Sequence, residues 1–273
     1  MDFLIFREIA VILAGVLGAW TDLKTGEIPD WITYPLIAFG IILGLLEANW
    51  IGLGSGALVF GIGYLLYYTG KIGGGDVKLF AGIAFALPFY IGVVFILPVL
   101  LYSALTAVVF LSVFYTVKLI RLKKLDLNEN RQGIFNAIIV GIALIAYFWI
   151  MLNSGFFQMQ NALVLAIPMF FALIFMALEK SIRKNFFAKT IKIKDLEEDE
   201  LIAWDFLPEK TKKLLDLKFK RIIDEKLKAE LKKEKISEIP VYRDLPRFAP
   251  FILAGIVLTI LRPELVAGIF KIG

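Results

Sequence analysis

The 273-residue sequence contains no cysteine and no histidine. Without cysteine, the chain can form neither disulfides nor a thiolate nucleophile. Without histidine, it cannot build a Ser-His-Asp triad, a Cys-His pair or a metal site with histidine ligands. Any acid–base catalysis by this chain must therefore use Asp, Glu, Lys or Tyr, and we expect no metal and no other cofactor.

Charge is also scarce over most of the sequence, which is 59% hydrophobic and has a mean hydropathy of +0.78. Apolar runs of this length are typical of a membrane protein that crosses the bilayer several times. Residues 1–20 lack a basic start and a small-residue cleavage site, so we expect a membrane helix there rather than a signal peptide. The net charge of +5 comes largely from loops, and we expect contact with the lipid bilayer and no binding of nucleic acid.

The apolar runs predict the positions of the membrane helices. The run over 77–119 is too long for one helix, because a crossing needs about 20 residues, so we expect two short helices that turn between Pro88 and Pro98. We predict an all-α polytopic membrane protein with six to eight transmembrane helices, and we favour eight. The remaining predicted helices cover residues 3–20, 31–46, 51–68, 134–152, 161–178 and 248–270.

Residues 179–247 differ from the rest because they are dense in charge. The segment that begins at Lys189 alternates polar and apolar residues and predicts a strand, for which Val241–Asp244 is a candidate partner. Between them, apolar residues at helical spacing predict an amphipathic helix. These residues are Leu214, Leu217, Ile222, Leu227 and Leu231. We therefore predict a membrane domain (1–178), a small soluble α/β insert in the cytoplasm (179–247) and a final transmembrane helix (248–273).

The distribution of Lys and Arg predicts which loops face the cytoplasm. Loops rich in Lys and Arg stay on the cytoplasmic side of the cell membrane. With eight crossings and both termini outside, every loop that contains Lys or Arg faces the cytoplasm. Without the 134–178 hairpin, six crossings remain and the orientation of every other loop is unchanged. Lys or Arg occurs in loops 21–30, 70–76, 119–133 and 179–247, and neither occurs in the turns at 47–50 and 153–160.

Two acids, Asp22 and Asp76, lie at the same predicted membrane face. Asp76 follows three glycines in Ile72–Lys78, and glycines let the backbone turn sharply and let a second backbone approach closely. Two neighbouring carboxyl groups do not readily both ionise, so the pair holds one proton. The ionised group can then take a proton from water while the other donates to a carbonyl oxygen. This arrangement predicts peptide hydrolysis without histidine, cysteine or a metal.

Two motifs in the sequence resemble those of one family. Gly73-Gly-Gly-Asp-Val-Lys-Leu resembles the GxGD signature of the type IV prepilin peptidases, and the segment Asp22–Asp30, with Ile28-Pro29, resembles their other signature. Elsewhere the chain is similar only in being composed of apolar helices. Because the cysteine-rich element of the bacterial branch is missing, the sequence is more similar to the archaeal preflagellin peptidases.

This resemblance implies a function and a set of site residues. The family members are membrane-embedded GxGD aspartyl endopeptidases whose partners are preflagellin or prepilin precursors. They remove a short charged leader, which usually ends in Gly, at the cytoplasmic membrane face. By the resemblance, Asp22 and Asp76 are the catalytic residues. Gly73, Gly74, Gly75 and Lys78 then shape the active site or bind the substrate.

Other interpretations of these acids remain open. Paired carboxylates inside a membrane also line the ion and proton paths of transporters. Both acids lie at one face, however, and the sequence shows no inverted repeat of the transporter type. A third interpretation is a scaffold protein in which the acids only cap helices. Asp30 directly precedes the second predicted helix, so we expect an N-cap there, and Lys78 also fits the general excess of positive charge on the cytoplasmic side.

Overall fold

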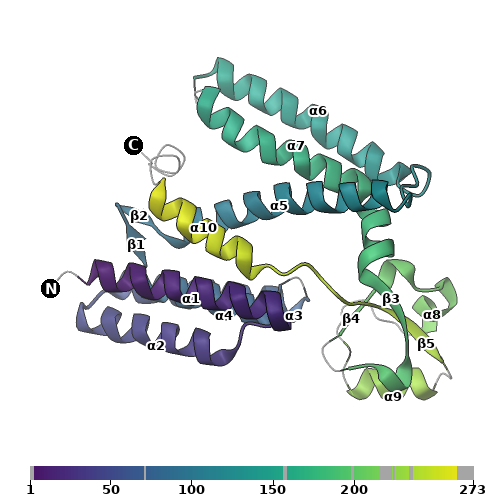
Figure 1. The fold of residues 1–273 in the computed structure, drawn as a ribbon, viewed down its shortest axis with the longest axis horizontal. Coiled ribbons are helices and arrows are strands. Elements are labelled where there is room, and N and C mark those ends of the chain that lie inside the picture. Colours follow the sequence, from purple (N-terminus) through teal and green to yellow (C-terminus); the bar gives the residue numbers. More distant parts are fainter. Residues whose placement is uncertain are drawn as a thin grey trace. The chain divides into compact units, whose positions relative to one another are not determined.

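The computed structural model describes residues 3–70, 72–155, 159–197, 200–214, 223, 225–233 and 236–262. These residues form mostly α-helices, with two small antiparallel sheets (Figure 1). The chain divides into two compact units. The first contains the described residues of 1–113, 139–173 and 247–273, and the second those of 114–138 and 174–246.

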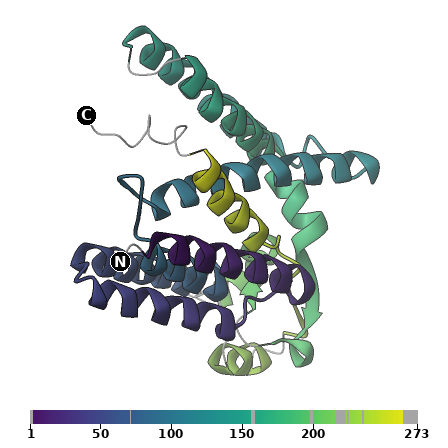
Figure 2. The same ribbon diagram turned by 60° about the vertical axis from the view of Figure 1, so that its left-hand side comes forward.

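Five helices form the centre of the first unit. They are α1 (Leu4–Thr25), α2 (Asp30–Leu46), α3 (Trp50–Tyr68), α4 (Gly74–Ala86) and α10 (Ala249–Leu261). Helix α4 packs against both α2 and α3, and α1 packs against α10 and α2. Figures 1 and 2 both show α1 and α2 as neighbouring helices. Leu79 and Ile83 of α4 are completely buried in the core between these helices, so α4 is enclosed on several sides.

Glycines allow α2 and α4 to approach closely. A Cβ atom at Gly40 would lie 2.4 Å from the carbonyl carbon of Phe85 and 2.5 Å from the amide nitrogen of Ala86. A Cβ atom at Gly82 would lie 2.8 Å from a methyl group of Leu36. Small residues of this kind let two membrane helices pack with their backbones in contact. The positions of α2 and α4 relative to each other therefore depend on these glycines.

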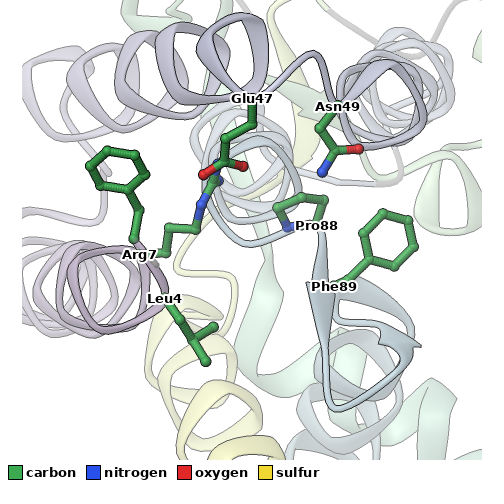
Figure 3. A pocket seen from close by; sticks show the side chains of 7 residues that line it. Leu4, Arg7, Glu47, Asn49, Pro88 and Phe89 are labelled. Atoms are coloured by element: carbon green, nitrogen blue, oxygen red, sulfur yellow. The ribbon is translucent and has the colours of Figure 1, made fainter. Parts of the chain in front are cut away.

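A buried arginine joins the ends of three helices (Figure 3). Arg7 of α1 is 5% exposed, and its Nη1 donates to the carbonyl oxygen of Ala86 at 2.5 Å while its Nη2 donates to Oε2 of Glu47 at 2.8 Å. A charge removed from water needs such partners. The pair lies beside a cavity of about 330 Å³ and fixes the start of α1 to the ends of α2 and α4. The cavity is also lined by Phe3, Leu4, Asn49, Pro88 and Phe89.

The long apolar run over 77–119 divides as predicted. Helix α4 ends at Ala86, and a hairpin of β1 (Phe89–Tyr90) and β2 (Val93–Val94) leads into α5 (Ile96–Arg121). Pro88 cannot continue a helix because it lacks an N–H group. The prediction of two helices with a turn between Pro88 and Pro98 is therefore confirmed, although α5, with 26 residues, is not short as expected.

Five helices in the described part of the chain are long and apolar enough to cross a membrane. Helices α6 (Arg131–Asn153) and α7 (Met159–Ile182) form a hairpin as predicted, while α2, α4 and α10 are shorter. The protein is thus a polytopic membrane protein, and the number of eight crossings stays a prediction. The end of the predicted last helix, from residue 263, lies outside the described residues. The five spans are Leu4–Thr25, Trp50–Tyr68, Ile96–Arg121, Arg131–Asn153 and Ala162–Phe187.

The second unit contains the predicted α/β insert. Its sheet has the order β3-β5-β4, formed by β3 (Ala188–Lys192), β5 (Glu238–Tyr242) and β4 (Leu201–Ile202). Strands β3 and β5 are antiparallel, with Ala188 opposite Tyr242 and Lys192 opposite Glu238. The pairing of the segment at Lys189 with the segment at Val241 is therefore confirmed, although β5 begins earlier than predicted.

Two helices of the insert occupy the predicted amphipathic segment. They are α8 (Glu209–Leu214) and α9 (Glu225–Lys233). Leu227 and Leu231 of α9 are buried in one cluster with Ile239 and Val241 of β5. Residues 215–222, with Leu217 and Ile222, lie outside the described residues, and the boundaries of the three predicted regions stay predictions.

We expect Gly40→Ala to destabilise the protein by about 1–3 kcal/mol, because the new methyl group must displace the backbone of α4. Gly61→Ala is the matched control, since no described atom lies within 4 Å of a Cβ at Gly61. The control should be neutral or slightly stabilising. Thermal unfolding in detergent measures both variants. Equal melting temperatures for Gly40→Ala and the parent would contradict the close contact.

Candidate active site

Asp22 lies in the last turn of α1. The sequence predicted that the helix ends near residue 20, but α1 continues to Thr25. It ends at Gly26, whose φ of 85° is left-handed and whose N–H donates to the carbonyl oxygen of Asp22 at 2.8 Å. Asp22 is therefore part of a rigid helix, and it is only 6% exposed.

The carboxylate of Asp22 is held by the last described helix. Its Oδ2 accepts a hydrogen bond of 3.0 Å from the backbone N–H of Ala249, the first residue of α10. The first N–H groups of a helix lack partners within the helix and carry partial positive charge, so they suit a carboxylate. Ala249 could not be identified from the sequence, because a backbone donor leaves no motif. Pro250 gave the single available signal, since proline favours the first turn of a helix.

Asp76 is the third residue of α4. Gly73 is the N-cap of this helix, so Asp76 is not itself the N-cap. The Asp76 carboxyl group lies next to Gly73, where a Cβ atom would be 3.0 Å from its Oδ2. An acid in the first turn of a helix is stabilised by the partial positive charge of the helix start.

Asp22 and Asp76 line the same cavity. The cavity has a volume of about 280 Å³. The two carboxyl groups are close enough to interact electrostatically. Peptide-backbone groups and glycines form much of the remaining wall, so little side-chain bulk stands beside the acids. The lining residues are Asp22, Gly26, Glu27, Ile28, Gly73, Gly74, Gly75 and Asp76.

Gly75 lets the two halves of this cavity come together. A Cβ atom at Gly75 would lie 3.0 Å from Cβ of Ile28 and 3.2 Å from its carbonyl oxygen. The second backbone that approaches the glycines is thus that of Ile28, in the loop after α1. Gly73 has a φ of −70°, so no left-handed conformation is needed there. Gly75 places the loop that follows Asp22 against the turn that carries Asp76.

Lys78 and Asp30 contact each other. Lys78 Nζ lies 2.5 Å from Oδ1 of Asp30 and 4.9 Å from the ring centre of Tyr34. The expected N-cap at Asp30 was wrong, because Pro29 occupies that position and Asp30 is the first helical residue. Lys78 is not among the residues that line the cavity, and its contact with substrate stays a prediction.

Arg247 and Glu27 stand near the cavity and were not singled out by the sequence. The guanidinium group of Arg247 occupies the space over Gly26, where a Cβ atom would lie 1.8 Å from Nη1. Glu27 lines the cavity wall. Among the described residues, no group of three or more Asp or Glu side chains could hold a metal ion. Three carboxyl groups thus line the cavity: those of Asp22 and Asp76, and that of Glu27, which is exposed.

Comparison with known proteins places this cavity in a region of family similarity. Residues 9–112, which include Asp22 and Asp76, match the model of the type IV leader peptidase family. The prepilin peptidase EppA of Methanothermobacter thermautotrophicus is 36% identical over 86 residues, which are 29% of this chain and 22% of that protein. The match therefore spans about a fifth of the length of that relative. No solved structure matches the chain. Over residues 9–112, the chain is thus similar to the type IV leader peptidases.

Proposed function

We propose that this protein is a GxGD aspartyl endopeptidase in which Asp22 and Asp76 are the catalytic pair. It removes a short charged leader from preflagellin-like or prepilin-like precursors at the cytoplasmic face of the membrane. The observation that carries this proposal is that both carboxyl groups line one cavity within the residues that match the family model.

The pair can hydrolyse a peptide bond by sharing one proton. The ionised carboxylate takes a proton from water, whose oxygen attacks the carbonyl carbon of the scissile bond, while the protonated partner donates its proton to the carbonyl oxygen. The C–N bond then breaks, the departing amine receives the proton that came from water, and one hydroxyl group of the new carboxyl product returns a proton to the second aspartate. Because the proton belongs to the pair, neither aspartate is assigned a fixed role as acid or base.

Helix starts keep the two carboxyl groups in position for this step. The N–H of Ala249, the first residue of α10, orients Asp22, and Asp76 is in the first turn of α4, next to Gly73. Both helix starts are fixed by packing rather than by flexible side chains.

The substrate must reach this cavity as an extended segment. A peptide bond inside a helix already uses its carbonyl oxygen in the backbone ladder. A charged leader followed by an apolar helix places the scissile bond at the membrane interface. The glycine-lined wall offers room for an extended backbone, and a Gly before the cleavage point of the precursor reduces crowding further.

Loss of either aspartate should abolish cleavage. Asp22→Asn and Asp76→Asn keep the side-chain shape but cannot hold or take the proton, so we expect kcat/KM to fall about 100-fold or more. The assay is cleavage of purified precursors of the flagellin and pilin types in detergent. Asp195→Asn is the matched control, because this exposed carboxyl group is not among the residues that line the cavity. Near-normal turnover by either catalytic variant would remove the pair from the mechanism.

Gly75→Val should reduce cleavage strongly although both acids remain. The valine side chain must push Ile28 away from α4 and so separate the walls that carry Asp22 and Asp76. Gly61→Val is the control, since Gly61 is on a helix and a Cβ there meets no described atom within 4 Å. Cleavage rates and thermal melts are measured together. A folded Gly75→Val protein with normal turnover would show that this contact does not set the geometry of the site.

The cytoplasmic position of the site can be tested in this cysteine-free chain. Lys24→Cys places a single thiol two residues after Asp22, on an exposed residue. We expect a membrane-impermeant thiol reagent to label it only from the cytoplasmic side, because residues 21–30 are one of the predicted loops that contain Lys or Arg. Asn153→Cys, in the turn without Lys or Arg, should label only from outside. The reverse pattern would overturn the orientation.

A further inference from the structure

A third cavity lies in the second unit, where the start of α6 meets the end of α7. Its volume is about 740 Å³. It contains no residue of the proposed active site. The residues that matter for its chemistry are Arg131, Ile134, Phe135, Ile138 and Lys180, with Glu129 at the wall.

A buried polar contact holds the two sides of this cavity together. Nδ2 of Asn130 donates to Oγ of Ser181 at 2.5 Å, and Oδ1 of Asn130 accepts the backbone N–H of Ser181 at 3.1 Å. Both residues are at most 1% exposed. Arg131 follows Asn130 and Lys180 precedes Ser181, so this contact places the two cations at the same end of the helix pair.

Helices α6 and α7 also approach each other closely beside this hydrogen-bonded contact. A Cβ atom at Gly133 would lie 2.7 Å from the carbonyl oxygen of Met176 and 3.1 Å from that of Ala177. The backbones of α6 and α7 are therefore in contact one turn from the cations. Most of the cavity wall therefore comes from two packed helices, and Asn128 and Glu129 of the turn before α6 complete it.

The positive charge of this cavity is not neutralised within the described structure. Neither Arg131 nor Lys180 forms an ion pair with any residue that the structure describes, whereas their neighbours do. Glu129, the acid at the wall, is paired with Lys184. Two cations thus share one cavity without a described counter-charge, which favours binding of an anion.

The cavity continues from these cations onto an apolar surface. Phe135 and Ile138 line it and are 57% and 56% exposed. Arg131 is the first residue of the candidate span Arg131–Asn153, and Lys180 is in the last turn of α7, within the charged final part of the candidate span Ala162–Phe187. The cations therefore lie toward one end of both spans, where lipid headgroups are expected, and the apolar side chains of α6 follow toward the bilayer interior.

We propose that this cavity binds one anionic phospholipid, with its phosphate between Arg131 and Lys180 and an acyl chain along Phe135 and Ile138. Basic pockets between membrane helices on the cytoplasmic side suit such headgroups. Arginine adds directional, paired hydrogen bonds to phosphate. A free phosphate ion would use the cations but would leave the apolar wall without a ligand.

Native mass spectrometry of the full chain in detergent tests this site, with phosphatidylglycerol as the anionic lipid. The wild type should bind one molecule, and R131Q/K180Q should bind at least tenfold more weakly. The control K123Q/K124Q removes the same charge from exposed lysines of the preceding loop and should change affinity less than twofold. R131K/K180R keeps the charges and should retain binding within about threefold, which separates charge loss from misfolding.

Two further ligands identify what the cavity recognises. Phosphatidylcholine, which has no net charge, should bind at least tenfold more weakly than phosphatidylglycerol. Inorganic phosphate at millimolar concentration should not displace the lipid. Equal losses in R131Q/K180Q and K123Q/K124Q, equal binding of the two lipids, or displacement by phosphate would each overturn the proposal.

Discussion

The contact between Gly75 and Ile28 is the constraint on which the proposed site depends. There is no room for a side chain at Gly75 without displacing the backbone of Ile28. Because of this contact, the loop after Asp22 lies against the turn that carries Asp76. The cavity between the two acids exists because the two backbones meet there.

The rest of the first unit supports this contact. At one end of α1, Arg7 binds the ends of α2 and α4, and at the other end Ala249 of α10 donates to Asp22. A buried carboxylate without a donor would be unfavourable by several kcal/mol, on the order of the cost of an unpaired buried charge. The hydrogen bond from α10 therefore connects the last described helix to the geometry of the N-terminal acids.

Much of the architecture was predictable, because long apolar runs indicate membrane helices and alternating polar and apolar residues indicate strands with one buried face. The turn between α4 and α5 followed from the length of one run and from Pro88, and the β3–β5 pairing followed from alternation at Lys189. The juxtaposition of Asp22 and Asp76 in one cavity followed from loop charges and helix ends. Their catalytic role stays a prediction.

Other features could not be predicted, because they depend on contacts between residues distant in the sequence. Helix α1 continues to Thr25 and ends at Gly26, which has a left-handed backbone conformation. A glycine in a polar segment does not by itself show from the sequence that a helix ends there. Asp30 resembled an N-cap, but α2 begins at Asp30 itself and Pro29 is the N-cap. The donor at Ala249 is a backbone group 227 residues from Asp22.

The central claim is that Asp22 and Asp76 act as one unit, and a double-mutant cycle on precursor cleavage tests it most directly. Residues that act as a unit show strongly non-additive losses. If the pair shares one proton, kcat/KM of Asp22→Asn/Asp76→Asn will be within about threefold of either single variant. If instead the two single losses multiply in the double variant, the acids act independently and the shared-proton mechanism is wrong.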